Sequence, residues 1–183
     1  MTKRQLLRDD LNCAWRSVIK NFYDAQQIDS EASLQAYFAA TLINRFEKAK
    51  RKSWRIFLEP TIKLPPSSIH RKPDLLICNN NQIIGVVELK YAPRGEGNEI
   101  YEKDLKTLLI LSENRQHFQI ANERYLGPLK SVKSYSLAKD AVLCWAGVYS
   151  GPRLSTQKFK EAGARDELLA LHPIKSPDNP GTI

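Results

Sequence analysis

The feature of this chain that most restricts its fold is an apolar run, residues 83–87, that ends in Glu88, Leu89 and Lys90. A run that is apolar at every position is typical of a strand in the middle of a sheet, where both faces are covered. Because side chains alternate along a strand, Glu88 and Lys90 should point to one face and Leu89 to the other. The sequence therefore predicts a carboxylate and an ammonium group side by side at the end of a buried strand.

A second strand is predicted just before this one, over residues 72–78, because the turn-forming run 79–81 consists of three asparagines. A hairpin folded about the last asparagine places Asp74 opposite Glu88 on the same face. Two opposed carboxylates destabilise a pair of strands, and burial makes the arrangement more costly. Lys90 compensates part of this charge. The net negative pocket that is left suits a hard divalent cation such as Mg²⁺.

The remaining sequence alternates between helix and strand patterns. Apolar residues recur every three to four positions in three segments, which predict amphipathic helices over 2–24, 30–48 and 98–113. Strands are predicted at 54–62 and 141–149, a short helix near 158–171, and short helices and loops over 116–140. Ser30 or Asp29 is the expected N-cap of the second helix and Asn98 that of the third. This order predicts an α/β fold with a mixed central sheet of about four strands flanked by helices.

Charge and composition restrict the partners and the compartment. Lys and Arg number 28 against 20 Asp and Glu, a formal net charge of +8, which favours nucleic acid but serves solubility equally well. Apolar runs are far shorter than the roughly 18 residues of a membrane span. The charged first ten residues are also unlike a signal peptide, so a cytoplasmic protein without membrane contact is expected. We expect residues 1–173 to form one domain and 174–183, rich in proline and polar residues, to form a flexible tail.

Pro73-Asp74, followed after thirteen residues by Glu88-Leu89-Lys90, resembles the signature of the PD-(D/E)xK nuclease superfamily, which includes many restriction endonucleases and Holliday-junction resolvases. The resemblance extends to the order of elements over 30–149 and implies a restriction-endonuclease-like core. It implies that Asp74 and Glu88 bind Mg²⁺, with Mn²⁺ as a substitute, and that the Leu89 carbonyl is a further candidate ligand. It also implies that Lys90 orients or helps deprotonate the attacking water.

The activity implied by this resemblance is metal-dependent hydrolysis of DNA phosphodiester bonds. An endonuclease is favoured over an exonuclease because the chain carries no accompanying helicase module and no Gln-x-x-x-Tyr motif after Lys90. By analogy with enzymes that cut both strands, a homodimer is a further expectation. Two alternatives are a non-catalytic nucleic-acid-binding module that keeps the nuclease fold and a structural subunit of a larger complex. The intact Asp/Glu/Lys set argues against both.

Many members of that superfamily also place an acidic or amide residue on the helix before the sheet. Glu31 fits this role here, with Gln35 one turn further along the same helix. A glutamate at this position is equally well explained by its favourable interaction with the helix dipole. His70 precedes Asp74 by four residues and is a candidate auxiliary residue, as a phosphate ligand or a base.

Basic residues near this centre are candidates for contact with nucleic-acid phosphates, although each can also be an ordinary solvated charge. They are Arg71, Lys72, Arg94, Lys103 and Lys106. A denser basic run follows the second predicted helix, where cations also suit the helix C-terminus. It comprises Arg45, Lys48, Lys50, Arg51, Lys52 and Arg55.

Overall fold

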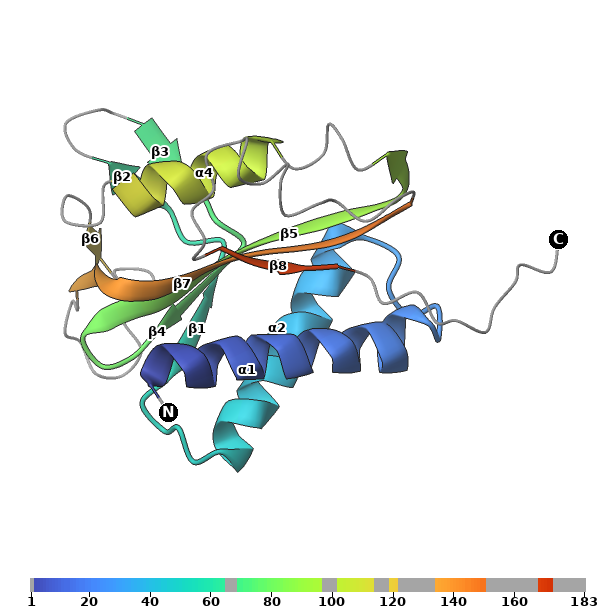
Figure 1. Cartoon of the computed structure of the whole chain (residues 1–183), viewed down its shortest axis with the longest axis horizontal. Helices are drawn as coiled ribbons and strands as arrows, with labels where there is room; N and C mark the ends of the chain where they lie inside the picture. The colour runs from blue at the N-terminus through green and yellow to red at the C-terminus, as the bar shows by residue number, and fades with distance from the viewer. Residues whose placement is uncertain are drawn as a thin grey trace, which may run out of the picture.

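A mixed β-sheet separates two layers of helices in the computed structural model, which describes residues 2–64, 69–96, 102–113, 119–121, 134–150 and 168–172. The sheet has six strands, in the order β1-β4-β5-β7-β6, and β8 also pairs with β7. Helices α1 and α2 cover one face and α4 covers the other (Figure 1). The predicted α/β class with a mixed sheet is confirmed.

The bounds of the elements are as follows. The helices are α1 (Lys3–Val18), its π-helical continuation η1 (Ile19–Tyr23), α2 (Glu31–Lys48) and α4 (Glu102–Glu113). The strands of the sheet are β1 (Arg55–Leu58), β4 (Leu75–Cys78), β5 (Gln82–Glu96), β6 (Gln119–Ala121), β7 (Ser134–Ser150) and β8 (Leu169–Leu171). The strands β2 (Ile62–Leu64) and β3 (Ile69–Arg71) form a separate antiparallel ribbon.

The two helices on the lower face in Figure 1 are held by one apolar stripe each. In α1 this stripe packs so closely on the sheet that a Cβ atom at Gly85 would lie 2.9 Å from the Leu7 side chain. Helix α2 begins where it was predicted to begin, because the Ser30 side chain accepts a hydrogen bond from the Ser33 N–H and the Ser33 side chain bonds back to Ser30. This capping box fixes the N-terminus of α2 next to the sheet.

The hairpin of β4 and β5 has the predicted register. Leu75 pairs with Val87 and Ile77 with Gly85, so the next position along places Asp74 opposite Glu88. The turn is held by the Asn79 side chain, whose oxygen accepts hydrogen bonds from the N–H groups of the two residues at 81 and 82. A bulge between residues 77 and 78 shifts the pairing near the turn by one position and leaves the Asp74 end unaffected.

Several elements differ from the sequence-based expectation. The sheet has six strands rather than about four, because β6 and β8 both pair with β7. Residues 169–171 form β8 and not the end of a helix, since they pair in parallel with residues 144–146. Likewise, β7 begins at Ser134, inside the region expected to hold helices and loops. The three-residue strands β6 and β8 depend on a partner, β7, that is distant in sequence. The expected cap at Asn98, residues 158–167 and the tail 174–183 lie outside the described residues.

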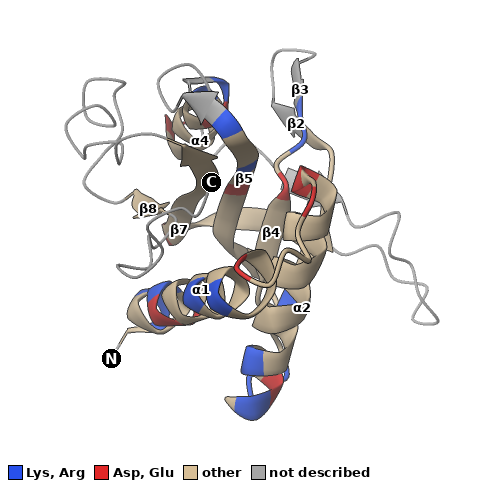
Figure 2. Ribbon diagram, turned by 90° about the vertical axis from the view of Figure 1, so that its right-hand side faces the viewer, with Lys and Arg blue, Asp and Glu red and all other residues tan. Residues whose placement is uncertain are grey.

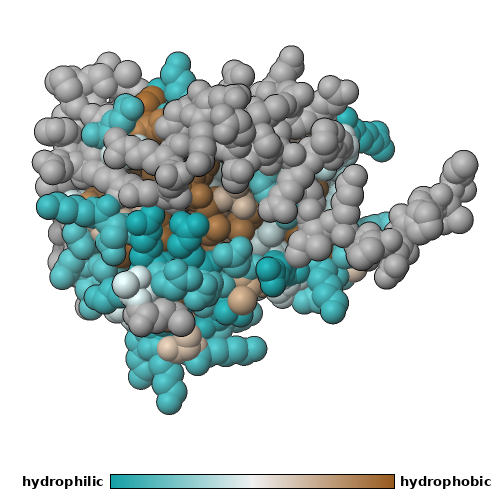
Figure 3. Space-filling view, viewed as in Figure 1, coloured by the Kyte–Doolittle hydropathy of each residue, from teal (hydrophilic) through white to brown (hydrophobic). Residues whose placement is uncertain are grey.

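The surface of the described part follows from this layering. On the face seen in Figure 1, hydrophilic side chains cover α1, and hydrophobic residues show in the band above it (Figure 3). Within the described ranges, no helix is both long enough and apolar enough to cross a membrane.

Candidate functional site

The predicted carboxylate pair lies on the sheet face that α4 covers. Glu88 pairs with Trp145 of β7 and, by the register of the hairpin, stands opposite Asp74. Lys90 follows two residues later and pairs with Gly147 on the same face. Figure 2 shows the acidic and basic segments following one another along β5. The three residues that the sequence singled out are therefore on one face of adjacent strands.

Asp74 is fixed by hydrogen bonds to its backbone and its side chain. Its carbonyl oxygen accepts from the Gln35 side-chain amide at 2.8 Å and from the Glu59 N–H at 2.9 Å. Its Oδ2 accepts from the N–H of Leu89. Burial raises the pKa of Asp74 to about 6, while the hydrogen bond from Leu89 opposes that rise. Gln35, predicted as an auxiliary residue, thus acts on the backbone of Asp74.

Glu88 is the most deeply buried acid of the centre, with 6% of its surface exposed. Burial, followed by the charges of Asp74 and Asp104, raises its pKa to about 9. Trp145, 1% exposed, is its neighbour on β7 and part of the apolar surroundings that make ionisation costly. Glu88 is therefore protonated at neutral pH unless a positive charge is bound beside it.

Lys90 is held by the first turn of α2. Its Nζ lies 3.5 Å from Glu31 Oε2, and the same oxygen accepts the Tyr91 N–H at 3.2 Å. The Tyr91 hydroxyl in turn donates to the Ile28 carbonyl at 2.9 Å, which anchors the entry of α2 on β5. Glu31, predicted as a fourth residue of the centre, thus lies at the centre, paired with Lys90.

Asp104 on α4 is a further carboxylate of the centre that the sequence analysis did not single out. Burial raises its pKa, and the charge of Lys90 and the nearby Trp145 side chain lower it. Asp104 also raises the pKa values of Asp74 and Glu88, so its charge acts on both. The sequence does hold a signal for Asp104. It precedes the buried Leu108 by four positions and the buried Leu111 by seven, so it lies on the stripe of α4 that faces the sheet.

The basic residues predicted to contact phosphates lie on several different elements. Lys72 makes a 2.7 Å ion pair with Glu59, and both side chains are more than half exposed. Arg94, Lys103 and Lys106 are exposed, and Arg71 is half-buried at the end of β3. The backbone of His70 pairs with Lys63 in the β2–β3 ribbon, while its side chain lies outside the described part.

The donor set of this centre restricts the cation that it can hold. Among the residues that the structure describes, no three His, Cys, Asp or Glu side chains are close enough together to hold a metal ion. Asp74 and Glu88, which face each other, are the two candidate ligands of a cation at this centre. Mg²⁺ suits such a set, because it takes one or two carboxylates and keeps several waters, whereas a site built for Ca²⁺ supplies more protein oxygens.

Comparisons with known proteins find no match, so the role of this centre is interpreted from its geometry. No family model matches the chain, and searches of the curated proteins and of the solved structures find no significant match. What the geometry provides is a desolvated pair of acids, an ammonium group two residues away and a helix that closes over them.

Proposed function

We propose that this chain is a divalent-cation-dependent nuclease with a restriction-endonuclease-like core, which hydrolyses phosphodiester bonds of DNA. One observation carries the proposal: Asp74 and Glu88 face each other in desolvated surroundings, and Lys90 stands beside them on the same face. In the chain alone, ionising Glu88 beside Asp74 in these surroundings is costly. Carboxyl groups with perturbed pKa values in close proximity cluster at functional sites.

Each residue of the centre has a role in this proposal. Asp74, Glu88 and the Leu89 carbonyl would hold the cation, which when bound supplies Lewis acidity at the phosphate and a more acidic water. Lys90, kept in place by Glu31, places its ammonium group where it can orient a water molecule and stabilise charge on the phosphate oxygens. Gln35 keeps the backbone of Asp74 in position.

The surroundings of the centre support the same reading. Trp145 and the sheet exclude water from one side of Glu88, which strengthens electrostatic interactions there. Leaving aside β1–β3 and β6, which intervene, the order of a helix before the hairpin and a helix–strand unit after it, α2-β4-β5-α4-β7, is the order expected for a restriction-endonuclease-like core. The excess of basic residues, +8 overall, is compatible with a polyanionic substrate.

The test is nicking of supercoiled plasmid DNA with Mg²⁺, with Mn²⁺ and with EDTA. We expect conversion to the open-circular form with either cation, none in EDTA, and none with Lys90→Ala, whose partly exposed side chain can be removed without opening the core. Glu113→Gln, an exposed acid at the end of α4, is the matched control and should cleave normally.

Calorimetric titration with Mn²⁺ separates the alternatives. The wild-type chain should bind the ion at millimolar concentration or tighter, and Asp74→Ala should not. Plasmid cleavage by Lys90→Ala at the wild-type rate would refute the assignment of the centre. Salt-sensitive DNA binding without any uptake of the ion would instead identify a non-catalytic binding module.

A further inference from the structure

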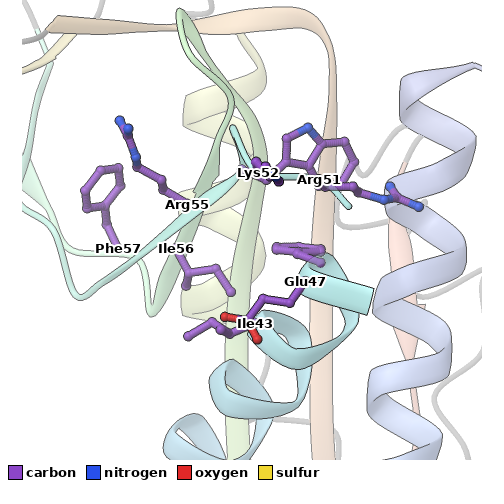
Figure 4. Close-up of a pocket in the computed structure, with 9 residues that line it drawn as sticks. Ile43, Glu47, Arg51, Lys52, Arg55, Ile56 and Phe57 are labelled. Atoms are coloured by element: carbon purple, nitrogen blue, oxygen red, sulfur yellow. The ribbon is translucent and has the colours of Figure 1, made fainter. Parts of the chain in front are cut away.

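A second feature of the surface is a pocket of about 540 Å³ between the C-terminal half of α2 and the edge strand β1. Its lining contains five apolar residues, three basic residues and a single acidic residue. In Figure 4, Ile43 and Glu47 reach the pocket from α2, and Ile56 approaches Ile43 from β1. The lining residues are Ile43, Phe46, Glu47, Arg51, Lys52, Trp54, Arg55, Ile56 and Phe57.

One wall of this pocket is held rigidly by a chain of contacts. Asp10 of α1, only 3% exposed, makes ion pairs with Arg51 at 2.9 Å and with Arg45 at 3.2 Å. The Arg51 guanidinium lies over the Trp54 ring, 4.4 Å from its centroid, and the Trp54 ring meets Phe46 edge to face. A wall that is ordered before a ligand arrives loses little entropy on binding.

The rim of the pocket is strongly basic. Arg45 and Arg51 are engaged by Asp10. Lys48, Lys50, Lys52 and Arg55 are exposed, and the Arg55 guanidinium also donates to the Tyr135 hydroxyl at 3.4 Å. None of these three lysines has an ion pair with another residue in the described ranges. Figure 2 shows basic segments gathered at the C-terminal end of α2. An apolar floor inside a cationic rim fits a ligand that is both anionic and aromatic or apolar.

The pocket and the carboxylate pair are connected by one strand. Successive side chains of β1 alternate between faces, so Arg55, Phe57 and the following Glu59 stand on the face that carries Asp74 and Glu88, whereas Ile56 stands on the α2 face. Because β1 is the edge strand of the sheet, its rim joins the two faces. The N–H of Glu59 bonds to the Asp74 carbonyl, so one end of β1 lies at the centre. Four residues of strand separate Arg55 from Glu59, which is about 13 Å.

We propose that this pocket binds a single-stranded segment of nucleic acid that continues from the carboxylate centre around the β1 edge of the sheet. The phosphates lie against Lys52 and Arg55, and an unstacked base lies on the floor formed by Ile43 and Ile56. That the bound segment is part of the nuclease substrate rests on the proposed nuclease function. A duplex keeps its bases stacked inside and would leave the apolar floor without a partner, whereas a charged groove with apolar and aromatic surface is the pattern of single-strand binding.

The experiment measures binding without cleavage. The Lys90→Ala chain, in EDTA, is titrated against a fluorescein-labelled 20-nucleotide single strand of mixed sequence, and the anisotropy is followed from 0.05 to 0.3 M salt. In this background, Lys52→Gln/Arg55→Gln removes two predicted phosphate contacts. Arg16→Gln/Lys20→Gln is the matched control, because it removes an exposed arginine and lysine from α1 and η1. Each phosphate contact on a single strand contributes about 0.7 to the slope of log K against log salt, so we expect the slope to fall by about 1.4 and binding at 0.1 M salt to weaken about 25-fold.

A second pair of variants tests the floor. Ile43 is 45% exposed, so Ile43→Glu adds a negative charge to the pocket without disturbing the core, and it should weaken binding of the single strand at least tenfold. Ala25→Glu adds the same charge to the exposed turn after η1 and should have little effect.

Two results would overturn the inference. One is binding by the pocket variants with the affinity and salt slope of their controls. The other is competition by polyglutamate as effective as that by unlabelled oligonucleotide, which would identify a site for acidic protein segments. The binding assay is independent of the plasmid cleavage assay. A chain that does not cleave plasmid but loses binding in the pocket variants refutes only the nuclease proposal. An active nuclease without the pocket effect refutes only this one.

Discussion

Replacing Glu88 with glutamine should stabilise the protein in the absence of metal. The pKa of Glu88 is raised by burial, and by the charges of Asp74 and Asp104, from 4.5 to about 9. An acid with a raised pKa contributes its full stability below the unfolded-state pKa and loses that contribution as pH rises toward the folded-state value. At pH 7 the loss is about 1.36 kcal/mol for each of the 2.5 pH units above 4.5, or about 3 kcal/mol. The glutamine side chain keeps the shape of the protonated acid and does not titrate.

The measurement is urea unfolding at 25 °C in EDTA, followed by tryptophan fluorescence at pH 4.5, 7 and 9. Glu88→Gln should match the wild type at pH 4.5, exceed it by about 3 kcal/mol at pH 7, and exceed it by more at pH 9. Addition of Mn²⁺ at pH 7 should stabilise the wild type and not the variant, because the ion binds only the ionised carboxylate. Equal stability of the two proteins at pH 7 would refute the claim that Glu88 is desolvated and protonated.

Three further substitutions have defined outcomes. Asp10→Ala removes a buried charge that pairs with Arg51, so chemical denaturation should show a loss of about 3 kcal/mol; a loss below about 1 kcal/mol would mean that the pair is solvated. Asp104→Asn should lower the plasmid cleavage rate about tenfold or more without lowering the melting temperature, because Asp104 acts on the charges of Lys90, Asp74 and Glu88. Wild-type kinetics would exclude such a role. Gly147→Ala would drive a Cβ atom into the Trp145 ring, so we expect destabilisation by about 1–3 kcal/mol in thermal unfolding. An unchanged melting temperature would show that the indole can move aside.

Local patterns predicted the part of the centre that depends on neighbouring residues. The asparagine turn set the register of the β4–β5 hairpin, and strand alternation put Glu88 and Lys90 on one face. The serine cap set the start of α2, and with it the position of Glu31. Each of these features is decided within about fifteen residues of chain, where turn chemistry and periodicity act.

Features that depend on distant partners were missed. The three-residue strands β6 and β8 exist only because β7 offers hydrogen-bonding edges to them, and no local pattern marks such a strand. Asp104 belongs to the centre because α4 crosses back over Glu88, and that placement follows from tertiary packing. The pocket at the end of α2 requires β1 to run beside that helix, so the basic run in the sequence could not reveal the apolar floor between its cations.

The parallel pairing of β5 with β7 also sets the order in which the centre assembles. Glu88 and Trp145 are more than fifty residues apart in the chain, whereas Asp74 and Glu88 meet across a short turn. Contacts between distant residues form slowly, so the hairpin should form while still hydrated, and the wall behind Glu88 should close late. Repulsion between the acids is then weak until the last step. Raising the pH from 4.5 to 9 should accordingly speed unfolding far more than it slows refolding.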